Sequence, residues 1–218
     1  MVISRDGGGR LTPLLKVAFY YHSTLNKDLT DAVMTQAVNA VRKAMPYAEI
    51  WHLRGPRVPK HAGVDKDILF IPFRRIHHQA MMESGPTLFL DIDCWVQRDV
   101  YEVFYDRAFD AAICVRAQYD FTKPETWGNP PYNAGVIFSR SQKFWQKFAE
   151  HHEREDFPWN DATTCRFVDQ FAGDLTVKRL PGSIYNYTPH DPDEDLKDRA
   201  ILHYKGEAKK YWMKHREC

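Results

Sequence analysis

The chain has 218 residues, which is enough for one large domain or two small ones with a substantial hydrophobic core. Its 30 basic and 29 acidic side chains leave a formal net charge of +1, so no overall field attracts nucleic acid and no nucleic-acid partner is expected. No apolar run approaches the roughly 18 residues of a membrane-spanning helix, and the four cysteines lie far apart. These features favour a reducing compartment and predict a cytoplasmic protein without a transmembrane segment.

Residues 1–15 are expected to form a flexible leader. The triplet Gly7-Gly8-Gly9 resembles the glycine-rich phosphate-binding loop of sugar nucleotidyltransferases. Such a loop needs a buried strand in front of it to aim its backbone N–H groups, and only six mostly polar residues precede Gly7. We therefore place a single domain over residues 16–218.

Strands and helices are predicted to alternate in the first half of the chain. Apolar runs predict buried strands, and apolar residues at helical spacing predict helices. The expected order is a strand at 16–22, a helix at 28–45, strands at 48–53 and 68–73, a helix at 77–84 and a strand that begins at Thr87. This alternation indicates the α/β class, with a mostly parallel sheet flanked by helices.

The second half of the chain is expected to extend the same domain. A long irregular segment with three prolines fills residues 117–131. Around it, the pattern predicts a short helix at 99–105, strands at 110–115, 132–138, 176–180 and 200–203, and helices at 142–154 and 161–172. No internal repeat or linker divides these elements, so one domain remains the best description.

Two carboxylates interrupt the apolar stretch 88–96. In extended chain, Asp91 and Asp93 would point to the same face. Two like charges among apolar neighbours are costly unless a cation or a proton joins them, so a bound metal ion would explain the pair. The alternative is a strand that ends at Leu90, with both carboxylates solvated in a turn. The spacing alone leaves both interpretations open.

Residues near the C-terminus favour the metal interpretation. Ligands of open α/β sheets bind beyond the carboxyl ends of strands, where Asp91 and Asp93 lie, and carboxylate oxygens suit Mg²⁺ or Mn²⁺. His203 directly follows a late strand, Gly206 permits a close backbone approach to a ligand, and Lys209 offers a compact positive charge for phosphate. Alone, His203 would be a partly buried structural histidine. Together with the two aspartates, the three residues predict a metal and phosphate site.

Four segments of the chain, in order, resemble the motifs of one enzyme family. They are Leu88 to Val96 with its Asp-x-Asp, Tyr132-Asn133-Ala134-Gly135-Val136, Asp169-Gln170, and His203-x-x-Gly206-x-x-Lys209 followed by Trp212. On these segments the chain resembles the nucleotide-sugar-dependent glycosyltransferases of the GT-A fold, above all the retaining family 8 enzymes such as glycogenin and bacterial galactosyltransferases. The likeness extends from about Lys16 to Trp212.

The resemblance implies a donor site built around a metal ion. Asp91, Asp93 and His203 would bind Mn²⁺ or Mg²⁺ that bridges the diphosphate of a UDP-sugar, with Asp91 also contacting the ribose. Gly206 and Lys209 would hold the diphosphate. The metal and the lysine would stabilise the charge of the departing nucleoside diphosphate.

The resemblance also assigns residues to the base and to the sugar. Tyr20, Tyr21 and His22, at the end of the first strand, would contact the base. The residues implied to line the donor sugar and the reacting carbon are Asn133, Ala134, Asp169 and Gln170. Of these, Asn133, Asp169 and Gln170 are the expected catalytic residues. Asp169 lies at the edge of the apolar face of its helix, which leaves two positions open: partly buried beside the sugar, or salt-bridged on the surface.

Other functions and several acceptors remain open. Leu90-Asp91-Ile92-Asp93 also resembles the nucleophile motif of haloacid-dehalogenase phosphatases, although that motif usually lies on the first strand and continues with threonine or Gly-Thr. A non-catalytic sugar- or nucleotide-binding protein of the same fold is the second alternative, against which the intact ligand set counts. For a transferase, the acceptor can be a carbohydrate, a lipid-linked sugar or a protein. The chain is expected to lack the family's long C-terminal extension, which leaves the choice among these acceptors open.

Overall fold

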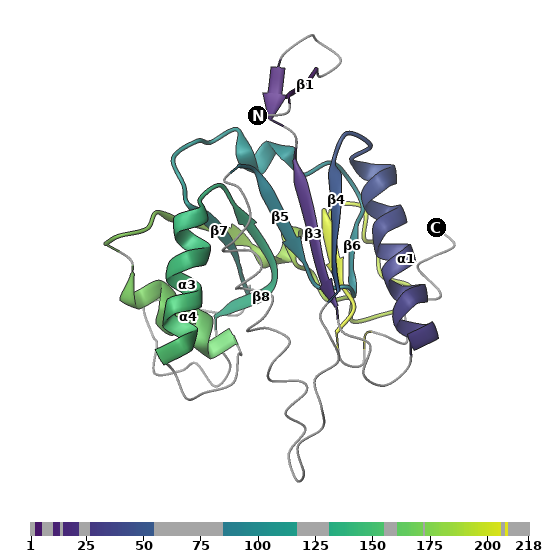
Figure 1. Cartoon of the computed structure of the whole chain (residues 1–218). Coiled ribbons are helices and arrows are strands. Elements are labelled where there is room, and N and C mark those ends of the chain that lie inside the picture. The colour runs from purple at the N-terminus through teal and green to yellow at the C-terminus, as the bar shows by residue number, and fades with distance from the viewer. Residues whose placement is uncertain are drawn as a thin grey trace.

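The computed structural model of the chain describes residues 3–5, 11–13, 15–21, 27–54, 85–116, 131–154, 161–171, 173–205 and 208. These residues form an α/β structure around a six-stranded sheet with the strand order β4-β3-β5-β8-β7-β9. Figure 1 shows this sheet with helices packed on both sides of it. The predicted fold class is therefore confirmed.

The central sheet is mostly parallel. Its strands are β3 (Lys16–Tyr21), β4 (Glu49–Arg54), β5 (Thr87–Leu90), β7 (Ala111–Val115), β8 (Tyr132–Ser139) and β9 (Val177–Pro181). β3 pairs in parallel with β4 and β5, and β7 pairs in parallel with β9. β8 runs antiparallel to both of its neighbours, β5 and β7. All strands of the sheet except β8 therefore run in the same direction.

Two apolar clusters lie on opposite faces of this sheet. On β5, Leu88 and Leu90 belong to one cluster and Phe89 to the other, because alternate side chains of a strand point to opposite faces. Every residue of β5 is buried. An unbroken apolar sequence is what a strand covered on both faces requires.

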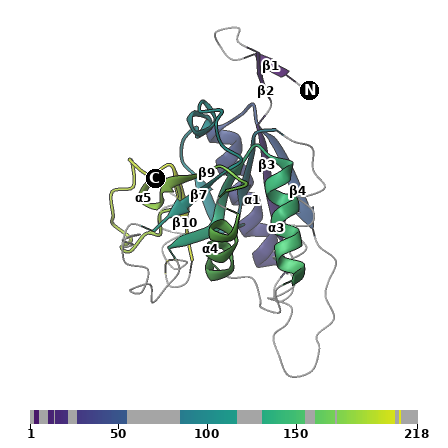
Figure 2. The ribbon, with the colours of Figure 1, turned by 90° about the vertical axis from the view of Figure 1, so that its left-hand side faces the viewer.

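Helices cover both faces of the sheet (Figure 1; Figure 2). They are α1 (Lys27–Ala44), α3 (Gln142–Arg154) and α4 (Asp161–Gln170), close to the predicted ranges. Val38 and Val41 of α1 pack in the cluster of Leu88. Phe148 of α3 and Phe167 of α4 pack in the other cluster, where their rings stack with centroids 4.3 Å apart. The helices were predictable because each carries an apolar face at helical spacing.

A second, two-stranded sheet places a late part of the chain beside β5. β6 (Cys94–Val96) pairs antiparallel with β10 (Ile201–His203), and His203 lies opposite Cys94 in the register. β6 begins directly after the turn that follows β5. The pairing therefore holds His203 next to that turn.

Short elements complete the described structure. They are the 3₁₀ turn η1 (Tyr101–Phe104), the one-turn helix α5 (Gly182–Tyr185) and the antiparallel pair β1 (Ile3–Arg5) and β2 (Leu11–Pro13). The helix expected at 99–105 is thus a shorter 3₁₀ turn. β6, α5 and the β1–β2 pairing inside the expected leader were not predicted.

Some predictions lie outside the described residues. They are the strand at 68–73, the helix at 77–84 and most of the irregular segment 117–131. Among the helices that the structure describes, none is both long enough and apolar enough to cross a membrane.

Candidate active site

The two aspartates lie in a tight turn between β5 and β6. β5 ends at Leu90, and the Cys94 N–H donates to the Asp91 carbonyl oxygen over 3.0 Å. The expectation that Asp91 and Asp93 share a face of extended chain was therefore wrong, because the backbone turns directly after the strand. Neither carboxylate is fully solvated, however, since the side chains are 32% and 17% exposed. The turn, rather than strand alternation, brings both carboxylates to one place.

His203 completes a cluster with these two carboxylates. Its Nε2 lies 3.2 Å from Asp93 Oδ1 and 3.8 Å from Asp91 Oδ2, and its side chain is only 5% exposed. The β6–β10 pairing and the Tyr204 N–H, which donates to the Asp93 carbonyl oxygen over 2.9 Å, position the imidazole. The three residues expected to bind a metal ion are thus brought together from two distant parts of the sequence.

Gly135 lies directly beneath this cluster. A Cβ atom at this position would lie 2.3 Å from His203 Cε1 and 2.8 Å from Asp91 Oδ2. The Gly135 carbonyl oxygen also accepts a 2.8 Å hydrogen bond from the Asp91 N–H. The glycine in the Asn-Ala-Gly segment is therefore required by the close approach of two site residues. The sequence pattern contained this residue but gave no role for it.

Two buried asparagines connect β8 to the far side of the His203 ring. Asn133 Oδ1 accepts a 3.1 Å hydrogen bond from the Gly135 N–H and a 2.9 Å hydrogen bond from Asn186 Nδ2. Asn186 Oδ1 lies 2.9 Å from His203 Nδ1. Asn186, which directly follows α5, was missed in the sequence. A polar residue within Tyr185-Asn186-Tyr187 carries no signal of its own, because its role depends on partners far away in the chain.

Cys94 lies close to the cluster but is poorly suited to bind a metal ion. Its Sγ and ligand atoms of Asp93 and His203 lie within 4.8 Å of one another. Burial raises the pKa of the Cys94 thiol well above its usual value, and the charges of Asp91 and Asp93 raise it further. The thiol lies 3.5 Å from the Gly135 carbonyl oxygen, to which it can donate, and a soft sulfur ligand is a poor match for Mn²⁺ or Mg²⁺. The donor set that fits is two carboxylates and one imidazole, which suits Mn²⁺ or Mg²⁺.

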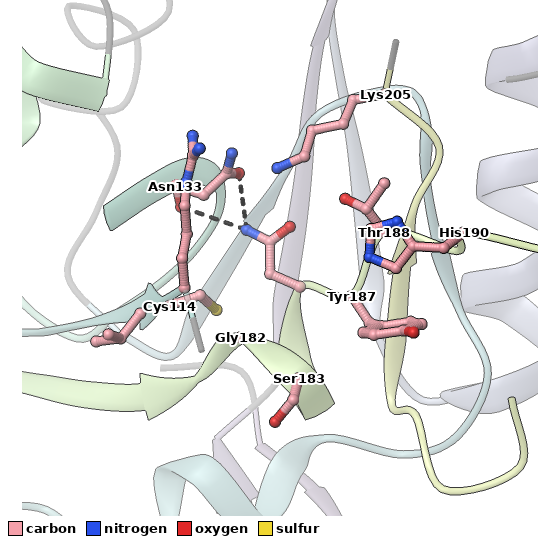
Figure 3. Close-up of a pocket in the computed structure, with 11 residues that line it drawn as sticks. Cys114, Asn133, Gly182, Ser183, Tyr187, Thr188, His190 and Lys205 are labelled. Carbon is pink, nitrogen blue, oxygen red and sulfur yellow. Dashed lines mark hydrogen bonds between the residues drawn. The ribbon is translucent and has the colours of Figure 1, made fainter. Parts of the chain in front are cut away.

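A pocket of about 240 Å³ adjoins the two asparagines. Its polar lining includes Arg116, Asn133, Ser183, Asn186, His190 and Lys205. Figure 3 shows the Lys205 side chain pointing toward Asn133. Burial raises the pKa of the Cys114 thiol in the pocket wall, and the nearby Lys205 ammonium partly offsets that rise. Lys205 was not among the predicted site residues, which included Lys209 instead.

The other predicted residues have mixed outcomes. Ala134 is buried on β8. Asp169 and Gln170 are both exposed on the last turn of α4, where Val168 is the residue that faces the core. Of the two positions open for Asp169, the structure shows the exposed one. Burial raises the pKa of Tyr132, and the Asp169 charge contributes to that rise, so this carboxylate lies near the start of β8.

The remaining predicted residues lie at the edge of the described structure or outside it. Tyr20 and Tyr21 end β3, but only their backbone is described. His22, Gly206 and Lys209 lie outside the described residues.

Comparison with known proteins finds similarity in structure but not in sequence. No protein-family model and no curated protein matches the sequence. One similar structure is a glycosyltransferase involved in the glycosylation of the major capsid of PBCV-1. The match covers 94% of this chain and 100% of that protein, with 15% identity and a TM-score of 0.64. A second is the glycosyltransferase GlyE of Streptococcus pneumoniae. That match covers 93% of this chain and 60% of GlyE, with 14% identity and a TM-score of 0.59.

A galactosyltransferase, LgtC, whose crystal structure contains donor and acceptor sugar analogues, also matches. The match covers 93% of this chain and 95% of LgtC, with 14% identity and a TM-score of 0.50. At this level of identity the likeness establishes the fold. The chain thus has the GT-A-like α/β fold of these glycosyltransferases, with the Asp91–Asp93–His203 cluster at the carboxyl end of β5.

Proposed function

We propose that the chain is a metal-dependent glycosyltransferase that moves a sugar from a nucleotide-sugar donor, with a UDP-sugar as the first choice and retention as the stereochemical outcome. The observation that carries this proposal is the convergence of Asp91, Asp93 and His203 Nε2 at the carboxyl end of a central strand. Ligands of open α/β sheets bind at such strand ends. The fold shared with known glycosyltransferases supports the same reaction class.

Asp91, Asp93 and His203 would hold the divalent cation. That cation would neutralise the diphosphate oxygens and so stabilise the leaving nucleoside diphosphate. Positive side chains would add to this effect, since Lys205 lines the adjoining pocket. Gly206 and Lys209 are proposed to hold the diphosphate itself. Charge stabilisation of this kind acts where a glycosyl transfer needs help most.

The pocket beside the two asparagines is the proposed place of the donor sugar. The walls of this pocket combine amide, hydroxyl and cationic groups that can bind sugar hydroxyls. Asn133 contributes to it from β8, and Ala134, Asp169 and Gln170 would complete the sugar contacts nearby. Asp169 is assigned to positioning and charge stabilisation rather than to a covalent step.

The base and the acceptor complete the proposal. Tyr20, Tyr21 and His22 are proposed to contact the uracil ring from the end of β3. The acceptor is a carbohydrate, a lipid-linked sugar or a protein, and the reaction is proposed to take place in the cytoplasm. One of the similar structures belongs to a glycosyltransferase involved in the glycosylation of the major capsid of PBCV-1, which makes a protein-linked acceptor a reasonable first probe.

The test is a donor panel. The protein is incubated with a set of nucleotide sugars, with Mn²⁺ or with EDTA, and released nucleotide is measured by mass spectrometry. We expect release that requires Mn²⁺ and that falls about 100-fold or more in Asp93→Ala. The matched control is Asp198→Ala, an exposed aspartate outside the site, which should behave as the wild type.

Three outcomes would contradict the proposal. Nucleotide release without metal dependence would exclude the metal-assisted reaction. Hydrolysis of a phosphomonoester, abolished by Asp91→Asn, would indicate a phosphatase instead. Binding of a nucleotide sugar without any turnover would indicate a binding protein.

A further inference from the structure

The amide of Asn133 has only one orientation compatible with its surroundings. Its Oδ1 lies 3.1 Å from the backbone nitrogen of Gly135. A backbone N–H can only donate, so the atom facing it must be the amide oxygen and cannot be the NH₂ group. The pairing of β7 with β8 jumps from Ile137 to Asn133, so Gly135 has no partner residue on β7. Its N–H instead donates to the side chain of Asn133, on the same strand.

The amide of Asn186 is fixed in turn by two acceptors. Its Nδ2 lies 2.9 Å from Asn133 Oδ1 and 3.3 Å from the Asn133 carbonyl oxygen. Neither oxygen can donate, so the NH₂ group of Asn186 must face both of them. Its Oδ1 therefore faces the other way. Both asparagines are only 7% exposed, which limits exchange of these partners with water.

This orientation determines where His203 carries a proton. Asn186 Oδ1 lies 2.9 Å from His203 Nδ1, and an amide oxygen can only accept. His203 Nδ1 must therefore be the protonated nitrogen of the neutral ring. The second nitrogen, Nε2, then presents its lone pair toward the Asp91 and Asp93 carboxylates. A lone pair directed at two anions is repulsive unless a metal cation or a second ring proton lies between them.

We propose that Asn186 is a positioning residue that holds His203 in the Nδ1–H tautomer and so keeps Nε2 available to bind a divalent cation. The hydrogen-bond chain begins at the Gly135 N–H and passes through Asn133 and Asn186 to the imidazole. The tautomer stands independently of any catalytic activity, whereas the purpose of the cation rests on the proposed function. Outer partners of this kind orient metal-bound histidines and make them better ligands.

The tautomer is measured directly by NMR of the histidine ring nitrogens. Metal-free protein with ¹⁵N-labelled histidine is recorded over a pH series up to about 10, and the tautomer is read where the ring signals no longer change with pH. His203→Gln identifies the signals of His203 by their loss. In the wild type we expect protonated Nδ1 and unprotonated Nε2. In Asn186→Ala we expect a shift toward protonated Nε2, the form that free histidine prefers.

The second readout is Mn²⁺ binding, measured by electron paramagnetic resonance without nucleotide. We expect Asn186→Ala to weaken Mn²⁺ binding by roughly 10- to 100-fold, as for loss of an outer hydrogen-bond partner. Asn133→Asp still presents an oxygen to Asn186 Nδ2 and should retain the wild-type tautomer. Asn39→Ala, which removes an exposed amide on α1, should match the wild type in both readouts.

A neutral wild-type ring with its proton on Nε2 and none on Nδ1 would overturn the proposal before any variant is compared. Ring signals in Asn186→Ala that are identical to the wild type would also overturn it. An altered tautomer with unchanged Mn²⁺ affinity would show that Asn186 has no role in metal binding. Both readouts need no sugar donor, so their success alongside a failed donor panel would refute only the proposed function.

Discussion

At the scale of single residues, Gly135 sets how closely three parts of the site can approach one another. The atom that any other side chain would add lies within contact distance of both His203 and Asp91. The site geometry therefore depends on a residue with no functional group.

We expect Gly135→Ala to distort the site. The added methyl group must displace His203 Cε1, which lies 2.3 Å from the Cβ position, or Asp91 Oδ2 at 2.8 Å. Overpacking of this kind costs about 1–3 kcal/mol, which urea unfolding would measure. Mn²⁺ affinity should fall in the same variant. Gly173→Ala is the matched control because a Cβ there meets nothing within 4 Å, and a Gly135→Ala protein as stable as this control would contradict the account.

Some site residues were accessible from the sequence and others were not. Asp91, Asp93 and His203 were expected to share a site because carboxylates and imidazole follow strands and match a known motif pattern. Asn186 had no such signal, since its partner Asn133 lies 53 positions away and only the fold joins them. Lys205 was passed over because Lys209 fitted the motif spacing.

At the scale of elements, α3 is bound to the sheet through an aromatic cluster. Phe144 and Phe148 are fully buried, and Trp145 donates from Nε1 to Ser139 Oγ over 2.7 Å. Packing of the helix on β8 in this way steadies the strand that carries Asn133.

Removal of one of these rings should weaken the whole domain. We expect Phe148→Ala to lower the free energy of unfolding by about 3–5 kcal/mol, because the ring is fully buried and stacks on Phe167. Thermal or urea unfolding measures the loss. Gln146→Ala, on the exposed side of the same helix, should change stability by no more than about 0.5 kcal/mol. Similar losses of unfolding free energy in both variants would mean that the apolar face of α3 does not stabilise its packing on the sheet.

The success of element prediction followed the strength of the local pattern. α3 was predicted with its observed bounds because apolar residues at helical spacing dominate it. β6 was missed because three residues give no period, and its pairing with β10 arises from the fold. The reversed direction of β8 had one usable signal: no helix was expected between β7 and β8, and a parallel return needs a crossover helix.

At the scale of the whole molecule, two exposed carboxylates join separate layers. Asp106, after η1, accepts from Lys178 Nζ of β9 over 3.1 Å. Asp174 accepts from Lys147 Nζ of α3 over 2.7 Å. The pKa of Asp106 is lowered by the Ala108 N–H and then by Lys178, and the pKa of Asp174 is lowered by Lys147.

These lowered pKa values predict lower stability in acid. Where the folded pKa lies below the unfolded one, the unfolded chain binds more protons, so stability is lost as the pH falls through the folded pKa. We expect the urea midpoint to fall as the pH drops below about 4. The double variant Asp106→Asn with Asp174→Asn should show a shallower fall over that range. Identical acid profiles for the variant and the wild type would contradict this assignment.

We propose above that Asp91, Asp93 and His203 form a metal site that binds a nucleoside diphosphate. Calorimetric titration of UDP with and without Mn²⁺ tests it most directly. We predict that UDP binding requires Mn²⁺ and that Asp93→Ala weakens it by more than about 100-fold, since loss of a ligand exceeds loss of an outer partner. Circular dichroism should show an intact fold in that variant. Equal UDP affinity with Mn²⁺ and with EDTA, or in Asp93→Ala and the wild type, would contradict the account.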